Sequence, residues 1–402
     1  METLLQLFIH LTKIPHCSKK TEKMREFLID FAKKLNYNIY TDSAGNLLFR
    51  KVDNPILTLQ SHYDMVCVGR APEIELIREG DWIRAVDSSL GADDGGGMAI
   101  MLKLMEKYPQ VEYLFTNDEE VGLIGALNLE LEIKSPYLVN IDSDFEYITI
   151  GSAGGEVVKL TYPLQREKIK GVIGEFSITG LPGGHSGEDI DKNIPNAIIE
   201  LGKRVERVVS FEGGEHDNSI PTSARAQVVL EGEGEVEALD SGYLPFLKNL
   251  PHGVIKFDEK YQIPAQSSNL AKVKDGEVTI FYRGNSHQDI DALRQLVESR
   301  KGKAQMEIVE KVAPWAPYEG KLAQLYHQLT GKPLKVIHAG LECGVLKEKF
   351  PHLEIISIGT KQEGIHSTKE RLYIPSLEAV YKDLERLIEN LEGDKDGFVS
   401  EN

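Results

Sequence analysis

Hydrophobic and polar positions switch between helical and strand-like spacing along the first third of the chain. The apolar run Pro55–Gln60 predicts a buried strand that ends at Ser61-His62, and Thr21–Leu35 predicts a helix. The further elements expected here are strands at Asn38–Tyr40, Asn46–Arg50, Val111–Phe115 and Tyr137–Ile141 and helices at Met98–Leu104 and around Val121–Leu129. Regular alternation of this kind predicts an α/β fold with a mostly parallel sheet covered by helices.

The middle of the chain follows a different pattern, because residues 168–311 are richer in glycine and acidic residues. Strand-like and helical stretches are mixed there, at Val172–Thr179, Pro195–Val208, Ala226–Glu231, Glu277–Tyr282 and Asp289–Ser299. We therefore expect an inserted α+β domain at 168–311 between two parts of the first domain, 1–167 and 312–402. The α/β pattern resumes with a helix at Lys321–Leu329, strands at Leu334–Ile337 and Glu354–Ile358, and a last helix with an apolar stripe from Leu377 to Leu391.

Composition narrows the possible partners and compartments. The 402 residues carry 46 Lys and Arg against 63 Asp and Glu, a formal charge of −17, which argues against a nucleic acid partner. The three cysteines, Cys17, Cys67 and Cys343, are widely spaced and odd in number, so we expect no disulfide framework and no thiolate zinc site. Residues 1–12 predict a helix rather than a signal peptide, and no apolar run is long enough to span a membrane, so a cytoplasmic protein is expected.

Five clusters of polar side chains carry the candidate chemistry, and all but one lie just beyond the C-terminal end of a predicted strand, where open α/β sheets bind ligands. They are His62-Tyr63-Asp64, Gly91-Ala92-Asp93-Asp94-Gly95, Asp118-Glu119-Glu120, Asp142-Ser143-Asp144, and His366. Each also has an ordinary structural interpretation, as turn residues, helix-start acids or a satisfied polar histidine. The glycines at 95–97 do not form a phosphate-binding loop, because the GxxxxGK pattern is absent.

The combination of these clusters favours a metal centre over the ordinary interpretations. Imidazole and carboxylate groups without thiolates suit a hydrolytic zinc, manganese or cobalt site. Two histidines and several carboxylates are enough for two ions that share one bridging group, and one neighbouring acid remains to act as a base.

A longer series of motifs carries a family resemblance. The motifs are LTLQSHYDMVC at 57–67, LGADDG at 90–95, DEEVG at 118–122, GLPGGHSG at 180–187, IHAGLECG at 337–344 and the His366-Ser367 loop. In this order they resemble the aminoacyl-histidine dipeptidase (peptidase D) branch of the zinc aminopeptidase/carboxypeptidase superfamily. The resemblance covers nearly the whole chain. It implies a zinc-peptidase-like catalytic domain and an inserted lid and dimerisation domain.

The resemblance also implies a role for individual residues. The implied metal ligands are Asp93, shared by two ions, His62 and Asp142 on one ion, and Glu120 and His366 on the other. Glu119 would be the general base, Asp64 would orient His62, and His185 would help to bind the scissile carbonyl as its oxyanion forms. Asn269 and Arg283 would hold the C-terminal carboxylate of the substrate. The peptide bond between Asp93 and Asp94 is expected in the cis form.

The implied activity is hydrolysis of short peptides, most of all Xaa-His dipeptides, by a homodimer with two divalent ions, zinc or else manganese or cobalt. A metal-activated water would attack, with Glu119 as its base. The chain departs from the family pattern in a shorter inserted domain and in Asp94, where many relatives have Asn. A tripeptidase, carboxypeptidase or N-acyl amino acid hydrolase would keep the same ligands. Glu342, suited to a free amino terminus, favours a peptidase, and Glu119 argues against a noncatalytic metal- or peptide-binding protein.

Overall fold

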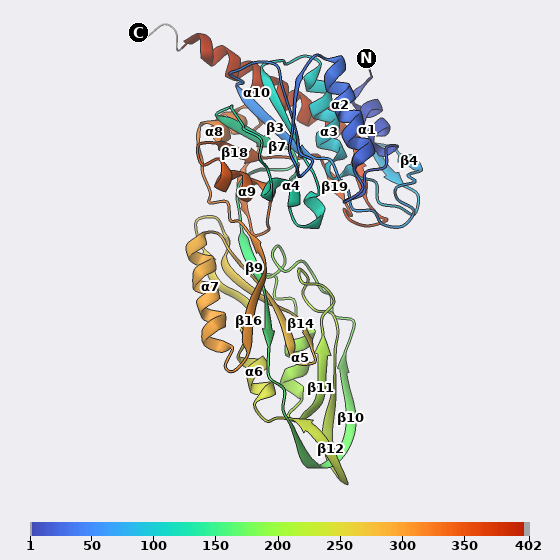
Figure 1. Cartoon of the computed structure of the whole chain (residues 1–402), viewed down its shortest axis with the longest axis vertical. Helices are drawn as coiled ribbons and strands as arrows, with labels where there is room; N and C mark the ends of the chain where they lie inside the picture. The colour runs from blue at the N-terminus through green and yellow to red at the C-terminus, as the bar shows by residue number, and fades with distance from the viewer. Residues whose placement is uncertain (1, 398–402) are drawn as a thin grey trace. The chain divides into compact units, whose positions relative to one another are not determined.

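The computed structural model describes residues 2–397, which form two compact units (Figure 1). Unit 1 comprises the chain up to residue 150, residues 317–335 and the chain from residue 345 onward, and unit 2 comprises residues 151–316 and 336–344. The domain boundaries expected at 168 and 311 stay a prediction. Among the described residues, no helix is both long and apolar enough to cross a membrane.

Unit 1 is built of strands and helices in alternation, with the 3-10 helix η1 among them. Its elements are α1 (Leu4–Thr12), α2 (Glu22–Lys34), β1 (Asn38–Thr41), β2 (Leu47–Arg50), β3 (Leu57–His62), β4 (Leu76–Glu79), β5 (Trp82–Ala85), α3 (Ala92–Met105), β6 (Val111–Thr116), η1 (Glu119–Val121), α4 (Ile124–Leu127), β7 (Tyr137–Asn140), β8 (Ile148–Ser152), α8 (Lys321–Thr330), β17 (Leu334–Ile337), α9 (Glu342–Lys349), β18 (Glu354–Ser357), β19 (Gln362–Glu363), β20 (Arg371–Tyr373) and α10 (Ile374–Gly397). The elements β8, β17 and α9 cross the boundary between the units.

The large sheet of unit 1 has the strand order β1-β2-β6-β3-β7-β18-β8-β17. Its central pairs, β6–β3, β3–β7 and β7–β18, are parallel, whereas β1–β2, β2–β6 and β18–β8 are antiparallel. His62 at the end of β3 pairs with Thr116 at the end of β6, and Gln60 pairs with Asn140 at the end of β7. The carboxyl ends of these strands therefore meet at one edge of the sheet, which is where the expected site residues follow.

Burial explains why these segments form the centre of unit 1. Every residue of β3 and β6 is buried, as expected for central strands covered on both faces. Helix α3 packs against both strands and is itself in contact with α1 and α10. The predicted stripe of α10 is confirmed, because Leu377, Val380, Leu384, Leu387, Ile388 and Leu391 are all buried.

One expectation for unit 1 needs correction, and one sheet was not expected. The helix expected around Val121–Leu129 is reduced to η1 and one turn of α4, because Gly122 and Leu123 both adopt a left-handed backbone conformation that interrupts it. A separate four-stranded sheet, β19-β20-β5-β4, was not predicted. Its short strands pair two segments that lie far apart in the sequence, so local patterning gave no indication of it.

The expectation that the chain has no disulfide is wrong. Cys17 and Cys67 are bonded across a sequence separation of 50, with their Cα atoms 5.5 Å apart, and Cys343 is buried outside any disulfide. The backbone N–H of Met65 donates to His16 O at 3.0 Å, which holds the two segments together beside the bond. Spacing in the sequence did not indicate this proximity, because it depends on the path of the chain after β3.

Unit 2 contains one large antiparallel sheet and three helices. Its elements are β9 (Gly154–Thr161), β10 (Arg166–Ile178), α5 (Ala197–Arg204), β11 (Val208–Gly213), β12 (Ala224–Leu239), α6 (Tyr243–Asn249), β13 (Gly253–Asp258), β14 (Ile263–Lys274), β15 (Glu277–Gly284), α7 (His287–Arg300) and β16 (Gln305–Val312). The strand order is β10-β12-β11-β14-β15-β9-β16, and β13 pairs with β14. One hydrophobic core includes residues of the sheet and of all three helices, such as Leu201, Tyr243 and Leu293.

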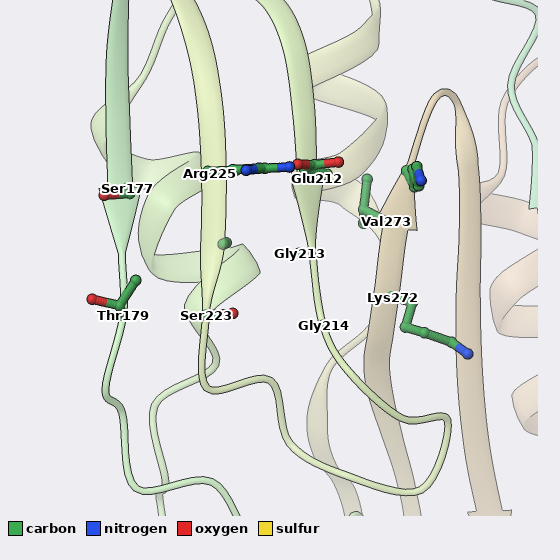
Figure 2. A pocket seen from close by; sticks show the side chains of 11 residues that line it. Ser177, Thr179, Glu212, Gly213, Gly214, Ser223, Arg225, Lys272 and Val273 are labelled. Carbon is green, nitrogen blue, oxygen red and sulfur yellow. The ribbon is translucent and has the colours of Figure 1, made fainter.

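A hollow of about 410 Å³ lies on the sheet of unit 2, between strands β11, β12 and β14 (Figure 2). Arg225 in this hollow is ion-paired with Glu212, and Lys272 with Asp217. None of the expected substrate-binding residues lines the hollow. It is therefore distinct from the candidate site described next.

Candidate active site

The five expected metal ligands come together in unit 1. His62 ends β3, Glu120 lies in η1 after β6, and Asp142 follows β7. Asp93 lies in the first turn of α3, and His366 lies between β19 and β20 with a left-handed backbone conformation. Parallel strands bring the first three to one sheet edge, and the other two reach the same place from a helix start and a hairpin.

Two groups of ligand atoms share Asp93. In the first, His62 Nε2 lies 3.1 Å from Asp93 Oδ1 and 3.8 Å from Asp142 Oδ2. In the second, His366 Nε2 lies 3.2 Å from Asp93 Oδ2 and 2.9 Å from Glu120 Oε1. Within each group all ligand atoms lie within 4.8 Å of one another. Asp93 thus presents one oxygen to each group, which is the arrangement of a bridging carboxylate.

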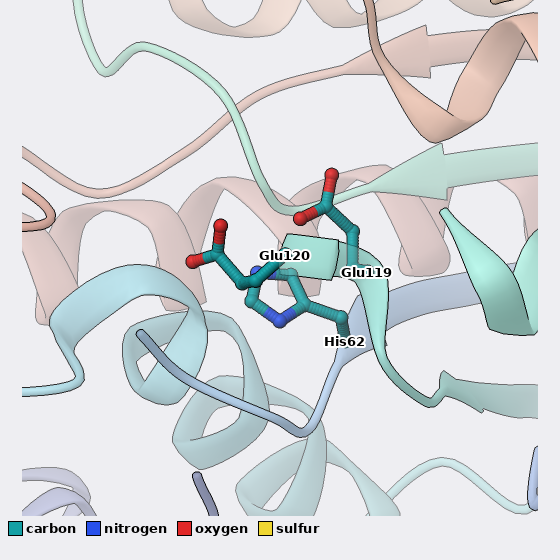
Figure 3. A group of neighbouring side chains, drawn as sticks. All are labelled: His62, Glu119 and Glu120. Atoms are coloured by element: carbon teal, nitrogen blue, oxygen red, sulfur yellow. The ribbon is translucent and has the colours of Figure 1, made fainter. Parts of the chain in front are cut away.

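Glu119 and Glu120 are adjacent in sequence and extend in different directions. Figure 3 shows both carboxylates leaving the same short turn beside the His62 ring. His62, Glu119 and Glu120 also form a group whose ligand atoms lie within 4.8 Å of one another. Glu119 is therefore close to the ligand groups without belonging to either of the two that share Asp93.

The electrostatics of the site fit a pair of bound cations. Burial and the neighbouring Asp93 raise the pKa of the Asp142 carboxyl well above its usual range, because two buried carboxylates repel each other. Burial by itself would lower the pKa of the His62 imidazole. The carboxylates of Asp142, Asp64 and Asp93 have the larger combined effect, so the pKa of His62 is raised. Hydrogen bonds to Asp93 and Glu120 raise the pKa of His366 to about 10. Each imidazole Nε2 thus faces two carboxylates, a donor set that suits a divalent ion.

Asp64 forms hydrogen bonds to His62 and to the turn that carries Glu119 and Glu120. Its backbone oxygen lies 3.0 Å from His62 Nδ1, so in the neutral ring Nδ1–H donates there and Nε2 has the lone pair that a metal ligand needs. The buried carboxylate of Asp64 accepts the backbone N–H of Glu119 at 2.9 Å and the hydroxyl of Ser18 at 2.7 Å. Asp64 therefore connects the His62 strand with the turn that carries Glu119 and Glu120.

The peptide bond between Asp93 and Asp94 is cis, as expected. Asp93 and Asp94 also have non-helical backbone angles at the start of α3, while Asp94 Oδ1 accepts the N–H of Gly97 at 2.9 Å. The buried Asp94 side chain thus closes the first turn of the helix, and Asp93 is left to face the two ligand groups.

The other expected site residues lie in unit 2. They are His185, Asn269, Arg283 and Glu342. His185 Nδ1 accepts the backbone N–H groups of Glu188 at 3.1 Å and Gly187 at 3.4 Å. An imidazole that accepts at Nδ1 carries its proton on Nε2, and burial together with Arg283 lowers the pKa of His185 to about 4. His185 is therefore a neutral hydrogen-bond donor at physiological pH.

Arg283 and Asn269 lie on adjacent strands of unit 2, β15 and β14. Arg283 is 4% exposed, its Nε has no hydrogen-bond partner among the described residues, and its guanidinium lies 3.8 Å from the ring centre of Phe281. Asn269 is fully buried and donates to Ser219 O at 2.7 Å, while its Oδ1 also lacks a partner among the described residues. Glu342 is buried at the first turn of α9. Buried polar atoms of this kind are usually paired, so Arg283 and Asn269 are suited to a ligand.

Two residues at the site were not predicted. Ser18 contacts Asp64, and Glu370 accepts backbone N–H groups of the segment that carries Asp93. Neither could be found from the sequence, because a serine or a glutamate that binds the backbone of a distant segment has no distinctive local pattern.

No family model matches the chain. The chain is 27% identical to the cytosol non-specific dipeptidase of Escherichia coli (strain K12), over 97% of this chain and 98% of that protein. The solved structure of an aminoacylhistidine dipeptidase from Vibrio alginolyticus is 26% identical, with a TM-score of 0.83 over 96% of each chain. An M20 family metallo-carboxypeptidase from Sulfolobus solfataricus shares the fold at 15% identity, with a TM-score of 0.57 over 96% of this chain and 99% of that one.

Sequence similarity over nearly the full length and the shared fold agree with the motif series along the chain. The site geometry agrees with them, since the motif residues of unit 1 meet around Asp93. The chain is therefore similar over nearly its full length to the cytosol non-specific dipeptidase and the aminoacylhistidine dipeptidase, and it shares its fold with an M20 family metallo-carboxypeptidase.

Proposed function

We propose that the protein is a metal-dependent dipeptidase that hydrolyses the peptide bond of short unblocked peptides. The observation that carries the proposal is the pair of ligand groups that share Asp93, with Glu119 beside them but outside both. A protein that only bound metal would have no need of that additional carboxylate. The similarity to two dipeptidases over nearly the whole chain supports the same reaction.

The metal ligands we propose are Asp93 as the bridge, His62 and Asp142 on one side, and Glu120 and His366 on the other. Two divalent ions, zinc or else manganese or cobalt, would supply Lewis acidity toward the peptide carbonyl and a water molecule that ionises near neutral pH. The crowded carboxylates support this set, because a cation would relieve the repulsion between Asp93 and Asp142. Asp64 would keep His62 in the tautomer that presents Nε2.

Glu119 would accept the proton of the attacking water and deliver a proton to the leaving amine. His185, as a neutral Nε2–H donor, would hydrogen-bond the carbonyl oxygen as negative charge develops on it. Arg283 and Asn269 would hold the substrate's C-terminal carboxylate, since the Arg guanidinium is already desolvated and its Nε has no hydrogen-bond partner in the described part of the chain. Glu342 would pair with the free amino terminus.

We expect unblocked dipeptides, including those with C-terminal His, to be hydrolysed faster than tripeptides or N-acetyl amino acids. An acetyl group removes the ammonium charge that Glu342 would bind. The test incubates the metal-loaded protein with a dipeptide set, matched tripeptides and N-acetyl amino acids, and follows amine release. A preference for the N-acetylated compounds would assign the chain to the N-acyl amino acid hydrolases instead. A preference for tripeptides would indicate a tripeptidase.

We also propose a homodimer formed through the edge strand β10 of unit 2. Val172, Ile173 and Phe176 on this strand are 44%, 53% and 44% exposed, which is high for large apolar side chains. An edge strand with exposed apolar residues readily pairs with a second copy. We expect sedimentation to give a dimer for the wild type and a monomer for Ile173→Glu. Val309→Glu, on the opposite edge strand β16, is the matched control and should stay dimeric; a monomeric wild type would contradict the proposal.

A further inference from the structure

The buried carboxylate of Glu370 binds the segment that carries Asp93. Its Oε2 accepts the backbone N–H groups of Leu90 at 2.7 Å and Gly91 at 3.2 Å. Its Oε1 accepts those of Ala92 at 2.7 Å and Asp93 at 3.4 Å. Glu370 is 2% exposed, so these four contacts are shielded from water.

These contacts lie at the N-terminus of helix α3, where backbone N–H groups lack partners within the helix. Helix α3 begins at Ala92, and the first N–H groups of a helix have no partner within it. Gly91, which precedes the helix, has no side chain to accept them. A negative charge at a helix start is also favourable because of the helix dipole. Glu370 therefore caps α3 from a segment 278 residues away from Ala92 in the sequence.

The segment that contains Glu370 also carries His366. The backbone N–H of Glu370 donates to Ser367 O at 3.2 Å, which folds the residues after His366 into a turn. From the other arm of the same hairpin, Gln362 Nε2 donates to Ala92 O at 3.2 Å. The hairpin thus presents the ligand His366 and holds the backbone of the ligand Asp93 from both sides.

We infer that Glu370 is a positioning residue for the metal pair, which fixes Asp93 relative to His366. Asp93 Oδ2 lies 3.2 Å from His366 Nε2, and Glu370 and Gln362 both connect the two segments that carry these residues through backbone hydrogen bonds at Ala92 and Asp93. This inference rests on the metal ligands given under the proposed function. It adds a residue that contacts neither ion nor substrate and acts through the backbone of Asp93.

Glu370→Gln tests the inference, because the amide keeps the size of the side chain but replaces one acceptor oxygen with an NH₂ donor. That donor would face backbone N–H groups. Groups that orient metal ligands typically alter metal affinity by about 10–100-fold, so we expect the Kd for Co²⁺ to rise by about that factor. Calorimetric titration with Co²⁺ alone measures it, and the visible absorption spectrum of the bound Co²⁺ should change.

Glu363→Gln is the matched control. It makes the same change of charge on the same hairpin, at an exposed residue that is ion-paired with Arg371, and should leave the Co²⁺ Kd unchanged. Equal weakening by both variants would attribute the effect to net charge and overturn the inference. A folded Glu370→Gln variant with wild-type Kd and spectrum would also overturn it, even if its unfolding temperature fell, because that result describes a purely structural residue.

If Glu370→Gln does not fold, Gln362→Ala decides the question. It removes the hydrogen bond to Ala92 O together with one to Thr360 Oγ1 of the same segment, and it should raise the Kd for Co²⁺ several-fold in the same direction. An unchanged Kd would overturn the inference. The titration contains no peptide. A wild type that binds two ions but hydrolyses no peptide would therefore contradict the proposed function and leave the test of Glu370 intact.

Discussion

Glu119→Gln should lower turnover of dipeptides by about 10²–10⁴-fold, the usual contribution of general acid–base catalysis, while metal content stays near that of the wild type. The amide keeps the size of the side chain and can hydrogen-bond, but it cannot take a proton from water. Glu119 lies outside the two ligand groups that share Asp93, so metal binding should not depend on its charge. Steady-state kinetics and elemental analysis of the same samples measure both quantities.

Glu120→Gln is the natural comparison, since it makes the same change one residue later. Glu120 Oε1 lies 2.9 Å from His366 Nε2 in the second ligand group, so this variant should lose metal. If Glu119→Gln lost metal and Glu120→Gln did not, the two roles would be exchanged. Near-normal turnover by a metal-loaded Glu119→Gln variant would require a different base.

Removing bound metal should abolish hydrolysis, and zinc, manganese or cobalt should restore it. Because Asp93 presents one oxygen to each ligand group, we expect about two ions per chain in the wild type. Asp93→Asn should reduce binding of both ions rather than one. Elemental analysis and activity assays after chelation and after metal addition measure these effects.

Asp53→Asn is a matched control for the Asp93 variant, because it makes the same substitution at an exposed residue outside the ligand groups. It should keep both ions and full activity. Undiminished hydrolysis by thoroughly demetallated wild-type protein would contradict the mechanism. Loss of a single ion in Asp93→Asn would contradict the bridging role.

Much of the site could be predicted from sequence because its chemistry and its position follow from local patterns. The apolar run Pro55–Gln60 predicts a buried strand that ends at Ser61-His62, and in a parallel sheet the end of such a strand, here His62, lies at the ligand-binding edge. The acids that follow β6 and β7 reach that edge for the same reason. The motif series then indicated the resemblance to the dipeptidases, although no single motif would have done so.

Other features depended on contacts between segments that are distant in the sequence. His366 lies beside Asp93 on a short hairpin that pairs with β5 and that local patterning did not predict. The Cys17–Cys67 bond likewise depends on the path of the chain after β3. Such pairings are decided by packing energy between distant segments, which the local spacing of residues does not encode.

The sequence by itself predicted the candidate ligand types and the order of the strands along the chain, and its motifs carried the resemblance to the dipeptidases. The tertiary structure decided which Asp93 oxygen lies in each ligand group, and only the tertiary structure decided that Glu370 binds the backbone beside Asp93. The physical reason is that side-chain chemistry is a property of each residue, whereas hydrogen bonds to backbone N–H groups depend on position alone. A glutamate such as Glu370 therefore acquires its role from where the fold places it.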